Sequence, residues 1–308
     1  MTAADRRAQQ ILNAAKKARQ MMLRDLGERD AQVIKVYRRT ADNLRLALSR
    51  SADADGAVNV RHLEGLLADI NRQLDEAAKR RNAEIDTGLQ AAAEYGAEGS
   101  AVGIAEAAGI TSAPAFHRVS REAVEFIREF VHADGLQLSD RLWRLDRGAK
   151  QTVAEILEDA VVQGTSARDT ARAILRRGDP LSADLKVKMG LNTTAKIGSQ
   201  IDQLLTPIKG MGNPVYRARL VAQTEINRAH RTAYRMQTQS FDFVKGMKWN
   251  LSKSHPRPDI CDPLATEDRH GLGPGVYPID EYPKVPAHPG CICFETAVLD
   301  DEALDKAV

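Results

Sequence analysis

Apolar side chains recur at steps of three, four and seven residues through most of residues 11–92, which is the repeat of one face of an α-helix. The first run comprises Ile11, Ala15, Ala18, Met22, Leu26, Val33, Tyr37, Thr40, Leu44 and Leu48. The second run comprises Leu63, Leu67, Ile70, Leu74, Ala78, Arg81, Ile85, Leu89 and Ala92. A polar turn at residues 51–56 separates them, so the spacing predicts a long antiparallel helical hairpin over residues 1–95. Neither helix is apolar all round, so each stripe needs a partner, either the other helix or a neighbouring protein.

The middle of the chain is also expected to be helical. Aromatic residues make up only 5% of the sequence, and this scarcity of large flat side chains argues against an extensive β core. Glycines between residues 96 and 113 predict a flexible linker there. Beyond it, stop signals separate shorter predicted helices at about 117–134, 138–163, 166–177 and 184–205, which together form a helical region over residues 114–212.

The last hundred residues have a different character. Asn213 and Pro214 are typical of a helix N-cap followed by the first helical position, and the helix is expected to run to about residue 240. Strand-like patterns follow at residues 241–249 and 291–298, and the segment between 241 and 298 holds eight of the 12 prolines. A small α+β domain is therefore expected over residues 213–308. The predicted fold class is mostly α, with this domain at the C-terminus and the long helical hairpin at the N-terminus.

The three cysteines all lie in the last fifth of the chain, and a histidine, His288, accompanies them. Three thiols are too few for a disulfide framework and fit a reducing compartment with a local thiol site. Structural zinc takes four nitrogen or sulfur ligands, so Cys261, His288, Cys291 and Cys293 are candidate zinc ligands that would close the proline-rich loop. On a regular strand Cys291 and Cys293 would share one face. The alternative is that the thiols are small buried hydrophobes and that His288 hydrogen-bonds a backbone carbonyl.

Several short segments of the C-terminal region occur in a specific order. They are Arg217 with Thr224-Glu225-Ile226-Asn227-Arg228-Ala229, then Trp249, Asp259-Ile260-Cys261, Gly273-Pro274-Gly275-Val276-Tyr277-Pro278 and Pro286-Ala287-His288-Pro289-Gly290-Cys291-Ile292-Cys293. Over residues 213–298 this order and spacing resemble the phage Mu F-like head morphogenesis family. Two positions depart from that pattern: Leu264 stands where many members have a second cysteine, and Ile292 where many have arginine.

The resemblance implies a bacteriophage minor head protein, a structural component of the procapsid that is not an enzyme. Its implied partners are the portal protein and a major capsid or scaffold protein, with residues 1–95 expected to make the assembly contact. The implied location is the capsid interior near the portal, and the host cytoplasm during assembly. Involvement in DNA packaging or ejection, and non-specific contact with packaged DNA, belong to the same expectation.

Two other functions remain open from the sequence. One is a zinc-stapled protein that contacts DNA inside the head, because residues 165–235 are basic. The arginines behind this reading are Arg168, Arg172, Arg176, Arg177, Arg217, Arg219, Arg228, Arg231 and Arg235. With few aromatics among them, they would contact phosphates rather than bases. The other is an enzyme that uses Cys261 with His255 or His288 as nucleophile and base, or Glu225 as a general base, although a structural ion pair explains Glu225 more simply. No apolar run of about 18 residues occurs, so no membrane-spanning segment is expected.

Overall fold

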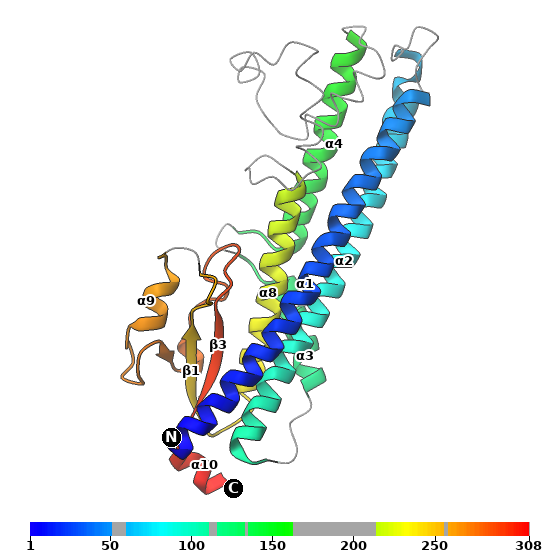
Figure 1. Ribbon diagram of the computed structural model, residues 1–308. Coiled ribbons are helices and arrows are strands. Elements are labelled where there is room, and N and C mark those ends of the chain that lie inside the picture. Colours follow the sequence, from blue (N-terminus) through cyan, green and yellow to red (C-terminus); the bar gives the residue numbers. More distant parts are fainter. Residues whose placement is uncertain (51–59, 111–115, 133–134, 163–213, 256–257, 308) are drawn as a thin grey trace. The chain divides into compact units, whose positions relative to one another are not determined.

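The computed structural model describes residues 1–50, 60–110, 116–132, 135–162, 214–255 and 258–307 (Figure 1). It is mostly helical with a small three-stranded antiparallel sheet near the C-terminus, as the predicted fold class requires. The helices are α1 (Ala3–Arg50), α2 (Val60–Ala108), α3 (Phe116–Glu129), α4 (Leu138–Val162), α8 (Pro214–Thr238), α9 (Cys261–Thr266) and α10 (Asp301–Ala307). The strands are β1 (Val244–Asn250), β2 (Val276–Tyr277) and β3 (Phe294–Leu299), and a short 3-10 helix, η2, spans Ile279–Glu281. The helices predicted at 166–177 and 184–205 lie outside the described residues.

The chain forms two compact units. One contains residues 1–28, 85–138 and 222–308, and the other contains residues 29–84 and 139–221. This division differs from the predicted one, in which residues 1–95 and 213–308 were separate domains. The physical reason is that a long amphipathic helix carries its apolar stripe along its whole length, so its two ends can be buried in different cores. No helix among the described residues combines the length and the apolar character needed to cross a membrane.

In the unit that contains residues 29–84, α1 and α2 pack as antiparallel partners, as the hairpin prediction requires. Its apolar core contains Leu44, Ala47, Leu48, Leu66, Ile70, Val153 and Leu157, which come from α1, α2 and α4. Arg81 of α2 is buried at 2% exposure and donates to Asp146 of α4 at 2.7 Å. Arg81 stands at a position of the predicted apolar stripe. Its buried charge is tolerated there because Asp146 of α4, far away in the sequence, supplies a carboxylate partner.

The unit that contains residues 222–308 is built around the sheet, whose strand order is β2-β1-β3. Both strand pairs are antiparallel, with Met247 opposite Tyr277 and also opposite Ala297. Helix α8 contacts the sheet through Tyr234, whose hydroxyl accepts the Ala297 N–H at 3.3 Å. The first turns of α1 and the last turns of α2 join this core, since Ile11 and Ile104 belong to the same apolar cluster as Leu299.

The predicted linker at residues 96–113 is helical as far as Ala108, so that prediction was wrong for most of its length. Its glycines permit close packing instead of flexibility. A Cβ atom on Gly96 would lie 2.0 Å from the His230 carbonyl oxygen, and one on Gly99 would lie 2.4 Å from the Ala18 Cβ. Helix α2 can therefore approach α8 and α1 only because these positions have no side chain. The helix ends at Gly109, whose φ of 71° is a left-handed conformation that favours glycine.

The close approach at Gly96 predicts an unusual response to a substitution that normally favours helices. Gly96→Ala should lower the free energy of unfolding by about 1–3 kcal/mol, because the new methyl group overlaps the His230 carbonyl. Gly65→Ala on the same helix is the matched control. Nothing lies within 4 Å of its added Cβ, so it should raise stability by up to about 1 kcal/mol. Urea unfolding followed by circular dichroism measures both, and equal effects of the two substitutions would contradict the packing role of Gly96.

Candidate metal centre

The structure brings the three cysteines together in the buried interior of the C-terminal region. Cys261 is the first residue of α9, and its Sγ atom lies 3.6 Å from the Sγ atom of Cys291. Cys291 and Cys293 precede β3, which begins at Phe294, so they do not lie on the predicted regular strand. The reason is local: Pro286 and Pro289 have no N–H to donate to a ladder, and Gly290 adopts a φ of 71° in the turn that follows. Cys293 lies close enough to both other thiols to alter their pKa values.

Cys261, His288 and Cys291 form a group that could hold a metal ion, because their ligand atoms all lie within 4.8 Å of one another. The spacing of the sulfur atoms fits this role. Two thiolates bound tetrahedrally to one zinc at about 2.3 Å would lie about 3.8 Å apart, close to the observed 3.6 Å. Three of the four predicted ligands therefore lie together, with Cys293 nearby. A second group that the motif did not indicate, His255 with Asp259 and Asp262, also has its ligand atoms within 4.8 Å of one another.

The pKa values of the three thiols are shifted in different directions. A hydrogen bond from Cys293 and the nearby Arg231 charge lower the pKa of Cys291. Burial and the neighbouring Cys291 raise the pKa of Cys261, and the hydrogen bond to Cys291 together with burial raises that of Cys293. These pKa shifts favour ionisation of Cys291 over that of Cys261 and Cys293. This environment does not activate Cys261 as a nucleophile, which requires a lowered thiol pKa.

Arg231 of α8 connects the cysteines to the sheet. Its side chain is 1% exposed, and its Nε donates to the Glu295 carboxylate at 2.6 Å. Its Nη1 lies 3.7 Å from the Cys291 sulfur, and its guanidinium lies 4.4 Å from the centroid of the Trp249 ring. Burial raises the pKa of Glu295, and the Arg231 charge opposes this rise. The buried arginine thus contacts a carboxylate, a sulfur and an aromatic face at once, while its Nη2 has no hydrogen-bond partner among the described residues.

Other side chains of α8 bind the backbone of the segment that carries Cys291. Asn227 donates to the Cys291 carbonyl, and Arg228 donates to the Val285 carbonyl at 2.6 Å. The Thr224 hydroxyl accepts the Gly290 N–H at 3.3 Å. These bonds fix the path of a proline-rich segment that cannot form a regular ladder of its own.

Glu225 is a structural ion-pair partner, as the simpler reading of the sequence expected. Its carboxylate accepts the Arg228 Nε at 3.0 Å and lies 3.2 Å from His132 Nε2. The involvement of His132 was not apparent from the sequence, because His132 lies far from α8 along the chain and only the packing of the region after α3 brings it there.

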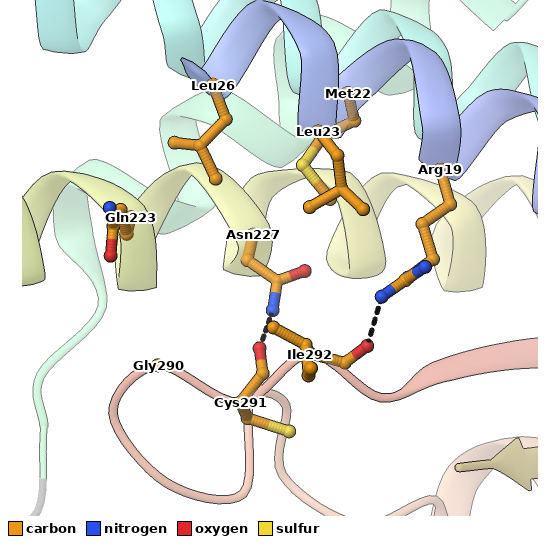
Figure 2. A pocket seen from close by; sticks show the side chains of 9 residues that line it. All are labelled: Arg19, Met22, Leu23, Leu26, Gln223, Asn227, Gly290, Cys291 and Ile292. Carbon is orange, nitrogen blue, oxygen red and sulfur yellow. Dashed lines mark hydrogen bonds between the residues drawn. The ribbon is translucent and has the colours of Figure 1, made fainter. Parts of the chain in front are cut away.

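The cysteine segment is also held from α1, beside a small pocket. Figure 2 shows Arg19 of α1 and Asn227 of α8 bonded to the carbonyls of Ile292 and Cys291, with Leu23 and Leu26 lining the pocket from the α1 side. The Arg19 bond is 2.7 Å long. The pocket has a volume of about 60 Å³, which is room for a few water-sized groups rather than for a substrate.

Seven of the arginines that suggested a DNA contact fall into two sets. Arg168, Arg172, Arg176 and Arg177 lie outside the described residues. Among those of α8, Arg219 forms an ion pair with Asp30, and Arg228 and Arg231 are buried in the ion pairs described above. These three side chains are therefore used within the protein.

Comparisons of this chain with protein-family models, with curated proteins and with solved structures found no match. The resemblance to Mu F-like proteins therefore depends on the ordered motif residues themselves. Thr224, Asn227 and Arg228 from the first motif segment contact the last one or the residue just before it.

The buried Arg231–Glu295 pair predicts a large penalty when one partner is removed. Arg231→Met should lower the free energy of unfolding by about 3–5 kcal/mol, because Glu295 is then buried without its counter-charge. Arg219→Met on the same helix is the control and should cost on the order of 1 kcal/mol, since the Arg219–Asp30 pair is partly exposed. Denaturant unfolding measures both, and an Arg231 penalty no larger than the Arg219 penalty would contradict the anchoring role.

Proposed function

We propose that this chain is a minor head protein of a tailed bacteriophage, a structural and assembly component of the procapsid. The observation that supports the proposal most is the way the motif residues contact one another. Asn227 and Arg228 in the helical segment bind the carbonyls of Cys291 and Val285. Motif positions that are separated by about 60 residues thus maintain one local structure, which supports a common structural role for the motif.

The proposed partners are the portal protein and a major capsid or scaffold protein, and the proposed location is the capsid interior near the portal. The α1–α2 pair is the best candidate for the assembly contact. Its first helix is basic, and Lys35, Arg38 and Arg39 are exposed on α1. An exposed basic helix face favours an acidic protein surface as its partner. Non-specific contact with packaged DNA is secondary, since it would depend on such exposed cations and fall steeply with salt.

We also propose that the cysteine site binds zinc as a structural ion that closes the loop between β1 and β3. Three buried sulfur ligands favour a soft or borderline ion over magnesium or calcium. Cys261, Cys291 and Cys293 would supply thiolates, and His288 would supply the nitrogen, since its ligand atom lies within 4.8 Å of those of Cys261 and Cys291. An ion at this point would tie α9 to the residues before β3, and its binding free energy would contribute directly to folding.

The head-protein proposal is tested by co-expressing the chain with the portal, scaffold and major capsid proteins of the same phage. The chain should co-purify with procapsids in few copies per particle and should be missing from particles assembled without the portal. Lys35→Glu/Arg38→Glu/Arg39→Glu should reduce incorporation several-fold, whereas Lys79→Glu/Arg80→Glu on α2 serves as the charge-reversal control. Procapsids that contain no copies of the wild-type chain would contradict the proposal.

The zinc proposal is tested on the purified full chain. It should contain close to one equivalent of zinc, and chelation should lower the thermal unfolding midpoint. Cys293→Ser should destabilise the zinc-loaded chain by several kcal/mol but the metal-free chain by only about 1–2 kcal/mol, the cost of a lost buried thiol. A preparation without metal that melts at the same temperature before and after chelation would show that the cysteines only pack.

A further inference from the structure

Two of the buried cysteines lie in direct contact through their sulfur atoms. The Sγ atoms of Cys261 and Cys291 are 3.6 Å apart, and both residues have free thiols. A disulfide bond is about 2.05 Å long, so an approach of about 1.5 Å separates this contact from a covalent bond. The two residues are 30 positions apart in the sequence, and a bond between them would connect the start of α9 to the segment before β3.

The third thiol, that of Cys293, is less suited to pair with Cys291. Only Ile292 separates the two residues, and side chains of α8 and α1 hold the carbonyls of Cys291 and Ile292 by hydrogen bonds. The Cys293 sulfur lies 3.9 Å from His255 Nδ1. Because disulfide geometry is specific, a bridge between Cys291 and Cys293 would have to bend this fixed backbone. A bridge from Cys291 to Cys261 joins two side chains that already touch.

A small oxidant can approach the pair from the pocket between α1 and α8. Cys291 lines this pocket, together with Leu23 of α1 and Asn227 of α8 (Figure 2). The pocket has room for a few water-sized groups, and hydrogen peroxide contains only two oxygen atoms. Cys261 and Cys293 are not among the described residues that line it. Cys291 is therefore placed to react first.

We propose that Cys261 and Cys291 are a redox-active pair, which hydrogen peroxide converts to a disulfide. In the first step the Cys291 sulfur bonds to one peroxide oxygen, the O–O bond breaks, and the thiol proton leaves with the other oxygen as water. Cys291 is then a sulfenic acid. In the second step the Cys261 sulfur bonds to the Cys291 sulfur, the S–O bond breaks, and the departing oxygen takes the Cys261 proton and leaves as a second water. The two thiols together lose two electrons and two protons, which reduce one peroxide to two waters.

The second step does not require an activated thiol at Cys261. Contact with Cys291 replaces an encounter between two molecules by a reaction within one chain, which supplies a large part of the rate. The hydroxide that leaves Cys291 is also a base for the Cys261 proton. The raised pKa of Cys261 is therefore compatible with its role as the second cysteine.

The disulfide and the proposed zinc ion would use the same sulfur atoms, so the two states exclude each other. Zinc binds thiolates, and neither sulfur of a disulfide is a thiolate. Both states connect α9 to the segment before β3. The cytoplasm keeps thiols reduced, whereas disulfides persist outside the cell. A head protein that leaves the cell in the particle would exchange the ion for the bond; this consequence rests on the proposed function, and the cross-link itself does not.

The pair is tested by treating the full chain with hydrogen peroxide after its metal has been removed with a chelator. Free thiols are then alkylated, and peptide fragmentation in a mass spectrometer locates the bond. We expect one bond within the chain, between Cys261 and Cys291, which dithiothreitol reverses, and an alkylated Cys293. Cys293→Ser is the matched control and should keep the yield within about twofold, whereas Cys291→Ser should lower it at least about tenfold. No cross-link, a bond that includes Cys293, or a bond between two chains would overturn the proposal.

Oxidation of the zinc-loaded chain separates this inference from the zinc proposal. The zinc-loaded chain should form the bond at least about tenfold more slowly than the metal-free chain, and it should release its zinc as the bond forms. Formation of the bond with the zinc retained would overturn the exclusion of one state by the other. A chain that binds no zinc but forms the bond would contradict the zinc proposal and support the redox pair. A chain that binds zinc but forms no bond after its removal would do the opposite.

Discussion

The buried guanidinium of Arg231 connects four parts of the C-terminal region. It belongs to α8, forms an ion pair with Glu295 of β3, stacks on Trp249 of β1 and approaches the sulfur of Cys291. A buried cation is tolerated only where opposite charge and hydrogen-bond acceptors surround it. The relative positions of the helix, the two strands and the cysteine segment are therefore linked, since moving any one of them would leave a charge without compensation.

The segment before β3 forms no regular strand pairing. Hydrogen bonds from side chains to its backbone fix its path instead. Asn227 and Arg19 bind consecutive carbonyls of that segment from α8 and α1. Helix α1 can take part because α2 packs closely against both helices at Gly96 and Gly99. The first turns of the chain thereby belong to the same compact unit as its last strand. The local structure that the cysteines need comes from segments up to 273 residues apart in sequence.

The helices could be predicted from the sequence because their apolar stripes repeat regularly, and Ile11, Met22, Leu48, Ile70 and Leu89 are all buried as expected. The glycines of α2 led to the wrong prediction of a flexible linker at residues 96–113. A residue without a side chain permits either flexibility or close packing, and which of the two occurs depends on the neighbouring helices. His288, Cys291 and Cys293 could be predicted as neighbours from their short spacing, whereas Cys261 lies 30 residues before Cys291. Arg231 could not be identified in the same way, because its role depends on the pairing of α8 with β3.

Ligand identity at the cysteine cluster is the point on which the proposed stapling of the C-terminal region depends. X-ray absorption at the zinc edge of the purified full chain measures it directly. We expect three sulfur neighbours at about 2.3 Å and one imidazole nitrogen neighbour at about 2.0 Å. A zinc site dominated by oxygen and nitrogen would contradict the proposed centre.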